Sequence, residues 1–141
     1  MMLVRKISLL GITCLILLFS CNKTEKIPAD IRIQIESPQQ NAEVGLTEIV
    51  NGKVSNPKAQ VYVLVHPLLT KLWWVQRFPS PTNQDGLWQT LCYFGTETRG
   101  IGESFEVVAI VTKDRLEEGQ MLTELPKDVV RSDIVTVRRA R

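Results

Sequence analysis

The sequence predicts an all-β fold, an antiparallel sandwich of about seven strands, on three observations. Stretches in which apolar and polar residues alternate recur along the chain, as in strands with one buried face. Other stretches are almost continuously apolar and β-branched, as in central strands buried on both faces. Turn-forming residues separate these stretches, and no segment shows a convincing helical pattern. A small closed barrel is the alternative architecture.

The first three predicted strands cover residues 31–36, 48–54 and 60–66. In the first, three isoleucines alternate with polar residues, and a Ser-Pro turn follows. An Asn-Pro turn follows the second strand. The third strand is nearly all apolar and predicts a central position, and Pro67 ends it because proline cannot donate to a sheet ladder.

Four more strands are predicted in the second half of the chain. Residues 72–78 are rich in aromatic side chains, and an Asp-Gly turn precedes the strand at 87–94. The strand at 104–112 is apolar on most positions, which predicts a second central strand. Residues 113–127 carry a glycine and a proline and are interpreted as a long connection. Residues 133–138 form the last predicted strand.

The amino-acid sequences of these strands resemble those of bacterial immunoglobulin-like surface modules over roughly residues 31–138. The resemblance rests on Ile-x-Ile-x-Ile-x-Ser-Pro from Ile31, Val50-Asn51-Gly52-Lys53-Val54, Val61-Tyr62-Val63-Leu64-Val65, Asp85-Gly86-x-Trp88 and Phe105-Glu106-Val107-Val108-Ala109. It implies an immunoglobulin-like or fibronectin-like topology, which needs no disulfide. Such modules are mostly spacers or binding domains, and the resemblance supplies no catalytic residue.

The first 20 residues have the pattern of an export signal. A short basic start is followed by an apolar stretch from Ile7 to Phe19, which is shorter than the roughly 20 residues that a spanning helix needs. Leu18-Phe19-Ser20-Cys21 resembles the lipobox of bacterial lipoproteins, although Phe19 departs from the usual small or β-branched choice. The resemblance implies cleavage before Cys21 and acylation of this cysteine.

Three segments are therefore expected: a lipoprotein signal peptide (1–20), a lipidated cysteine with a flexible tether (21–30) and an immunoglobulin-like sandwich domain (31–141). Acyl chains such as palmitate on Cys21 would hold the domain on a lipid bilayer, since two or more chains anchor stably. The expected location is the bacterial cell envelope, facing the periplasm or the cell surface.

Charge and cysteine content restrict the function further. Without Arg5 and Lys6 of the signal, 15 basic and 15 acidic residues remain, so no basic excess favours nucleic acid. Cys14 leaves with the signal and lipid occupies Cys21, so Cys92 is the one thiol expected in the domain. In its strand-like context it is expected to pack as a small hydrophobe rather than to react.

The residues offer little catalytic chemistry, so a non-enzymatic protein without cofactor or metal is predicted. His66 is the only histidine, and no paired Cys or His spacing typical of zinc sites occurs. His66 is expected at the end of a strand. The remaining enzyme hypothesis is an activity on envelope polymers built around His66 with a serine or Cys92, or around the acidic loops.

The candidate binding surface is a group of aromatic residues with one cation: Trp73, Trp74, Arg77 and Trp88. Trp73 and Trp74 are adjacent in a predicted strand and must point to opposite faces. One is expected to fill the core. The other either lies under the 113–127 connection or faces solvent, where it would stack on a sugar ring or anchor a protein.

Two functions from different classes follow. The first is a membrane-anchored envelope lipoprotein whose single domain is a non-enzymatic binding or positioning module, with an envelope protein or glycan as its partner. The alternative is a carbohydrate-binding module that uses surface tryptophans. An aromatic patch on one sheet face favours the alternative, and burial of all three tryptophans excludes it.

Overall fold

The computed structural model describes residues 26–79 and 82–140, and this part of the chain is all-β. The predicted signal peptide, Cys21 and the first part of the tether lie outside the described residues. The strands are β1 (Ile33–Ser37), β2 (Glu43–Val44), β3 (Thr47–Val54), β4 (Val61–Pro67), β5 (Trp73–Val75), β6 (Leu87–Tyr93), β7 (Ser104–Val111), β8 (Met121–Leu122), β9 (Val130–Arg131) and β10 (Val135–Arg139).

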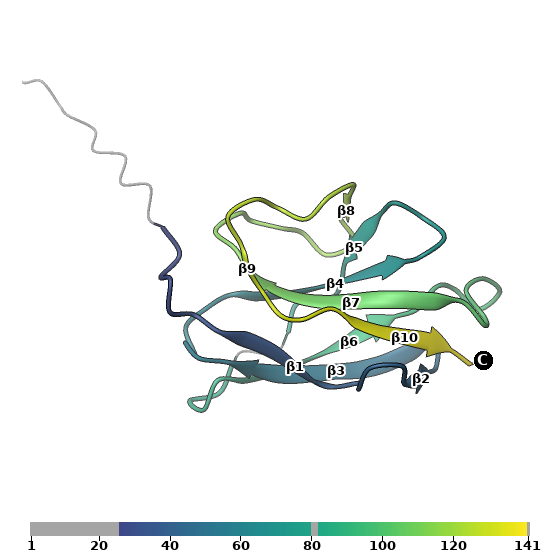
Figure 1. The fold of residues 1–141 in the computed structure, drawn as a ribbon, viewed down its shortest axis with the longest axis horizontal. Coiled ribbons are helices and arrows are strands. Elements are labelled where there is room, and N and C mark those ends of the chain that lie inside the picture. The colour runs from purple at the N-terminus through teal and green to yellow at the C-terminus, as the bar shows by residue number, and fades with distance from the viewer. Residues whose placement is uncertain (1–25, 80–81, 141) are drawn as a thin grey trace, which may run out of the picture.

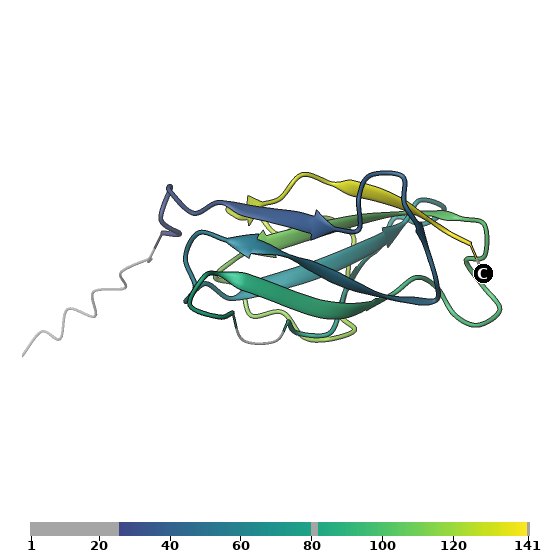
Figure 2. The same cartoon turned by 90° about the horizontal axis from the view of Figure 1, so that it is seen from below.

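The strands form two sheets that pack face to face (Figures 1 and 2). The small sheet has the order β1-β3-β6. The large sheet has the order β2-β10-β7-β4-β5-β8, with β9 paired to β7. All pairs are antiparallel except β2 with β10. The predicted all-β sandwich is confirmed, and the barrel alternative is wrong because the two sheets stay open and separate.

The main core lies between the sheets and follows the alternation in the sequence. On β6, Trp88, Thr90 and Cys92 face inward and are buried, while their neighbours face out. The opposing large sheet contributes the inward residues of β4, β7 and β10. Burial of this apolar surface is the main favourable term in folding, at about 25 cal/mol per Å².

A second apolar layer covers the outer face of the large sheet. Tyr62 and Leu64 of β4 lie beside Val108 and Ile110 of β7, and Leu116 packs on them from the connection after β7. Figure 1 shows this connection, with β8, above β4 and β7 on the side away from the small sheet. The prediction that β4 and β7 are central strands buried on both faces is confirmed.

One predicted strand is shorter in the structure: the strand expected at 72–78 is only Trp73–Val75. Residues 113–127 are the predicted connection, and they contain the two-residue strand β8. After Val75 the chain crosses from the large sheet to the small one, where the Thr90 hydroxyl donates to the Arg77 carbonyl at 2.6 Å. Because of this crossing, the hydrogen-bonded strand β5 ends at Val75, before the end of the aromatic-rich segment 72–78.

Candidate functional site

β5 places its two tryptophans on opposite sides of the large sheet. Trp74 is paired with Val65, a residue of the main core, so its ring lies on the side of the small sheet. Trp73 packs against the outer apolar layer and stacks on His66, with ring centroids 4.7 Å apart. Trp73 is half-buried, whereas Trp74 keeps 39% of its surface exposed.

Gln76 joins the edge of the large sheet to the edge of the small one. Its backbone N–H donates to the Val63 carbonyl at 2.8 Å, which continues the pairing with β4. Its side-chain Oε1 accepts from the Tyr93 N–H on β6 at 2.8 Å, and its Nε2 donates to the Trp74 carbonyl at 3.1 Å. Gln76 is buried, so this amide fixes Trp74 relative to β6.

A groove of about 670 Å³ lies where these two sheet edges meet the connections after β4 and β6. Its floor reaches the buried residues Val65 and Phe105. Its exposed apolar lining is formed by Leu69 (77% exposed), Trp74 (39%), Tyr93 (49%) and Ile101 (53%). Polar groups surround this lining: Thr70, Gln76, Thr96, Thr98, Arg99 and Glu103. An apolar floor with a few polar groups around it is the usual composition of a binding site.

The connection from β6 to β7 forms one wall of the groove, and Arg139 holds it in shape. The Arg139 guanidinium is buried and donates through Nη1 to the carbonyls of Phe94 (2.8 Å), Thr96 and Arg99 (2.6 Å). Gly95 has a φ of 87°, a left-handed conformation that favours glycine. The three carbonyls share the two hydrogens of Nη1, and these charge-assisted contacts fix the loop around the guanidinium.

The turn from β4 to β5 forms the opposite wall. Its Leu68 N–H donates to the Ser104 carbonyl at 3.1 Å, and its Thr70 N–H closes a turn on Pro67 at 2.9 Å. The carbonyl of Thr70 faces His66 Nε2 at 2.9 Å. The wall is thus tied to β7 and to the end of β4.

The structure separates the four residues of the predicted binding surface. Trp74 lies in the groove, and Trp73 lies on the other side of the sheet. Arg77 is exposed but does not line the groove. Trp88 does not line the groove; it is only 3% exposed, because the inward parity of β6 places its ring in the core against Gly52.

Sequence reasoning missed the residues that accompany Trp74. Tyr93 lies in a predicted strand, and the alternation of side chains along β6 places it on the exposed face, which could have marked it as a surface residue. Leu69, Arg99 and Ile101 belong to connections, where no periodicity marks their direction. Only the fold brings them beside Trp74.

A second hollow of about 400 Å³ lies over β1, β3 and β6. Its side chains are mostly amides and one acid, from Glu36, Asn51, Asn83 and Gln89. Leu87 is its one large exposed apolar residue. It is smaller than the groove, and the one aromatic residue that lines it, Trp88, is buried, so the groove is the stronger candidate.

His66 and Cys92, two of the residues that the enzyme hypothesis considers, lie apart: His66 stacks on Trp73 at the outer face of the large sheet, and Cys92 lies in the core between the sheets. Both ring nitrogens of His66 are within 2.9 Å of oxygen acceptors, Glu106 Oε2 and the Thr70 carbonyl. Cys92 is fully buried between the sheets, and this burial raises the pKa of its thiol. Within residues 26–79 and 82–140, no cluster of three metal-ligating side chains occurs.

No protein-family model matches the chain, and no curated protein matches it. In the described residues, no helix is long and apolar enough to cross a membrane.

Proposed function

We propose that this chain is a bacterial envelope lipoprotein, anchored by acyl chains on Cys21, whose immunoglobulin-like domain is a non-enzymatic binding module. The groove around Trp74 is its binding site. The observation that carries the proposal is the exposed aromatic and aliphatic lining of a groove whose two walls are held by dedicated hydrogen bonds.

The strand order supports the immunoglobulin-like assignment. In that fold, the first, second and fifth main strands share one sheet, and the third, sixth and seventh share the other. Here β1, β3 and β6 form the small sheet, whereas β4, β7 and β10 form the centre of the large one. The short β5 beside β4 corresponds to the additional strand of variable-type domains.

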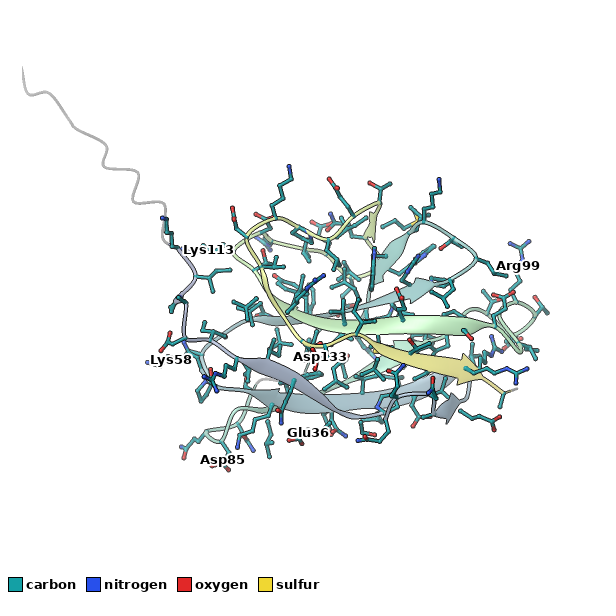
Figure 3. The ribbon with its side chains drawn as sticks, in the orientation of Figure 1. Glu36, Lys58, Asp85, Arg99, Lys113 and Asp133 are labelled. Carbon is teal, nitrogen blue, oxygen red and sulfur yellow. The ribbon has the colours of Figure 1, made fainter. Side chains whose placement is uncertain are left out.

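The position of the groove supports a module that faces away from its anchor. Arg99, on the groove wall, lies at one end of the domain, and Lys58 and Lys113 lie at the other, near the start of the described chain (Figure 3). Ile31, the first core residue, follows Cys21 by ten residues. The intervening chain reaches at most about 35 Å, so the domain stays near the bilayer and is attached at the end opposite the groove.

A non-catalytic role is supported by the state of the reactive side chains. A nucleophile needs a base within hydrogen-bond reach and access to substrate. Cys92 is buried, and His66 makes contacts through both nitrogens. Neither residue lines the groove. Binding is the activity that the groove's lining supports.

The anchor is tested by replacing the cysteine. Cys21→Ala, or treatment with globomycin, is expected to block removal of the signal, because lipidation precedes the cut in bacterial lipoproteins. The mature form should disappear in immunoblots of fractionated cells. Normal processing of Cys21→Ala would contradict the lipoprotein assignment without bearing on the groove.

A glycan is the second candidate ligand, because Trp74 and Tyr93 offer exposed aromatic faces beside the amide of Gln76. Titration with envelope glycan fragments should then change tryptophan fluorescence, and Trp74→Ala should abolish the change. Leu87→Ala is the matched control, since Leu87 is 43% exposed and lies outside the groove. An unchanged signal in Trp74→Ala would remove the glycan candidate.

A further inference from the structure

Arg139 places a positive charge inside the domain, behind the groove wall that Thr96 and Arg99 line. It is 2% exposed, and its Nη1 contacts the carbonyl oxygens of these two residues and of Phe94. In the part of the chain that the structure describes, no carboxylate lies within ion-pair distance of this guanidinium, and its Nε is buried without a hydrogen-bond partner. Carbonyl dipoles leave the net charge in place, and a buried charge without a counter-ion is unusual.

The same contacts orient the backbone of this wall. In a trans peptide unit, the C=O and the N–H point in opposite directions. The carbonyls of Phe94 and Arg99 point at the guanidinium. The N–H groups of the same two units belong to Gly95 and Gly100, so they point away from it. Both glycines line the groove, and neither N–H donates to another described residue, although Gly100 is buried and buried N–H groups are nearly always paired.

The two glycines lie side by side, next to the apolar floor of the groove. A Cβ on Gly100 would be 3.3 Å from the Gly95 Cα and 3.0 Å from Phe105 Cζ. Their φ angles are 87° and 95°, which favour glycine, and no side chain of their own covers the N–H groups. Backbone N–H groups gathered in this way form concave binding sites for anions. The exposed guanidinium of Arg99 belongs to the same lining.

This corner of the groove is complementary to an anionic group that is joined directly to an apolar one. Arg99 and Arg139 supply two positive charges, and Glu103 is the one acid among the described residues that line the groove, so an excess of positive charge remains. The apolar floor, Val65 and Phe105, begins beside Gly100. An α-carboxylate and an apolar side chain on the same Cα have this arrangement.

The polar groups of the walls favour a peptide over a hydrocarbon chain. Thr70, Thr96 and Thr98 bring hydroxyl groups to the lining, and these can exchange hydrogen bonds with the amides of a bound peptide. A fatty acid also carries a carboxylate, but its chain would cover the hydroxyl groups without pairing them, which costs free energy.

We propose that the groove binds the free C-terminus of a partner polypeptide whose last residue is apolar. The α-carboxylate accepts hydrogen bonds from the N–H groups of Gly95 and Gly100 and pairs with Arg99, and the last side chain lies against Phe105. Capture of a C-terminal carboxylate by backbone N–H groups is a recurring mode of peptide recognition. The inference rests on the proposed binding function of the groove, and it names the ligand of that site.

NMR titration of the intact ¹⁵N-labelled protein in detergent micelles tests the site, with acetyl-Gly-Gly-Leu as the probe. The free acid should shift the backbone signals of Gly95 and Gly100 and the indole signal of Trp74. The same peptide with a C-terminal amide should bind about tenfold more weakly, because hydrogen bonds to a charged group are stronger than those to a neutral one. Equal affinity of acid and amide, or no shift at the two glycines with the acid, overturns the proposal.

Two variants separate recognition of the carboxylate from the shape of the wall. Arg99→Gln keeps the backbone carbonyl that Arg139 contacts and removes only the exposed cation. It should weaken binding of the free acid about two- to fivefold, as for an exposed ion pair, and leave binding of the amide unchanged. Lys113→Gln removes a cation at the opposite end of the domain (Figure 3) and should change neither. Equal losses for acid and amide in Arg99→Gln would contradict the carboxylate contact.

Two further probes separate this ligand from the binding function itself. Decanoate carries a carboxylate without a peptide, and a neutral envelope glycan fragment carries neither. A Trp74 signal that shifts with either of them, but not with acetyl-Gly-Gly-Leu, would overturn the peptide C-terminus and keep the groove as a binding site. A Trp74 signal that shifts with none of the three would contradict both.

Discussion

Gly52 decides how the largest core side chain packs. It lies on β3 opposite Trp88 of β6. A Cβ at this position would lie 2.5 Å from Trp88 Cζ2 and would overlap the backbone carbonyl oxygen of Gln34. The glycine therefore leaves room for the indole beside β3 in the core.

Gly52→Ala is expected to destabilise the domain by about 2 kcal/mol, within the range of overpacked cores. The backbone of Gln34 cannot move away without disturbing the pairing of β1 with β3. Urea unfolding measures the loss. Gly45→Ala is the control, since its Cβ would meet only the Thr47 carbonyl at 3.5 Å. Equal stability of the two variants would contradict this packing.

Cys92 is expected to be inert in the folded protein. Burial raises the pKa of its thiol because the thiolate would be desolvated between the sheets, and the thiolate is the reactive form. Iodoacetamide at pH 8 should label the Cys92 thiol of the domain (31–141) only after denaturant is added. Rapid labelling under native conditions would show that the core opens, or that Cys92 lies elsewhere.

At the scale of elements, local periodicity predicts the long strands well. Isoleucine alternation at residues 31–36 and the apolar run at 60–66 correspond to β1 and β4, because burial on one or two faces leaves its pattern in the sequence. β2, β8 and β9 have two residues each, too few for a period. Their pairing depends on where the surrounding loops pass, which is a property of the whole fold.

The β6–β7 connection is the element most dependent on a single side chain. Arg139→Met removes the charge-assisted contacts of one NH₂ group with three carbonyls, so we expect a loss of about 3 kcal/mol and weaker binding at the groove. Arg138→Met is the control, because Arg138 is exposed and donates to one carbonyl, that of Gly102. Thermal unfolding compares the two variants. A control that loses as much stability as Arg139→Met would contradict the special role of Arg139.

The candidate site belongs to the whole molecule. Of the four residues that the sequence singled out, only Trp74 lines the groove. The side of the large sheet on which Trp73 lies depends on how β5 pairs with β4, and the burial of Trp88 depends on which residues of β6 face the core. Neither can be read from the residue types alone. Many of the other lining residues lie in turns that become neighbours only when the two sheets pack together. Sequence patterns thus predict the sandwich, whereas the groove forms only where the edges of the two sheets come together.

We propose that the domain is anchored at Cys21 and binds its ligand in the groove at its far end. Site-specific photocrosslinking in intact cells distinguishes the two ends, with p-benzoylphenylalanine at Leu69 in the groove and at Lys58 at the opposite end as control. We expect a discrete adduct from Leu69 that Trp74→Ala removes, and no such adduct from Lys58. The same adducts from both positions, or an adduct from Lys58 alone, would contradict it.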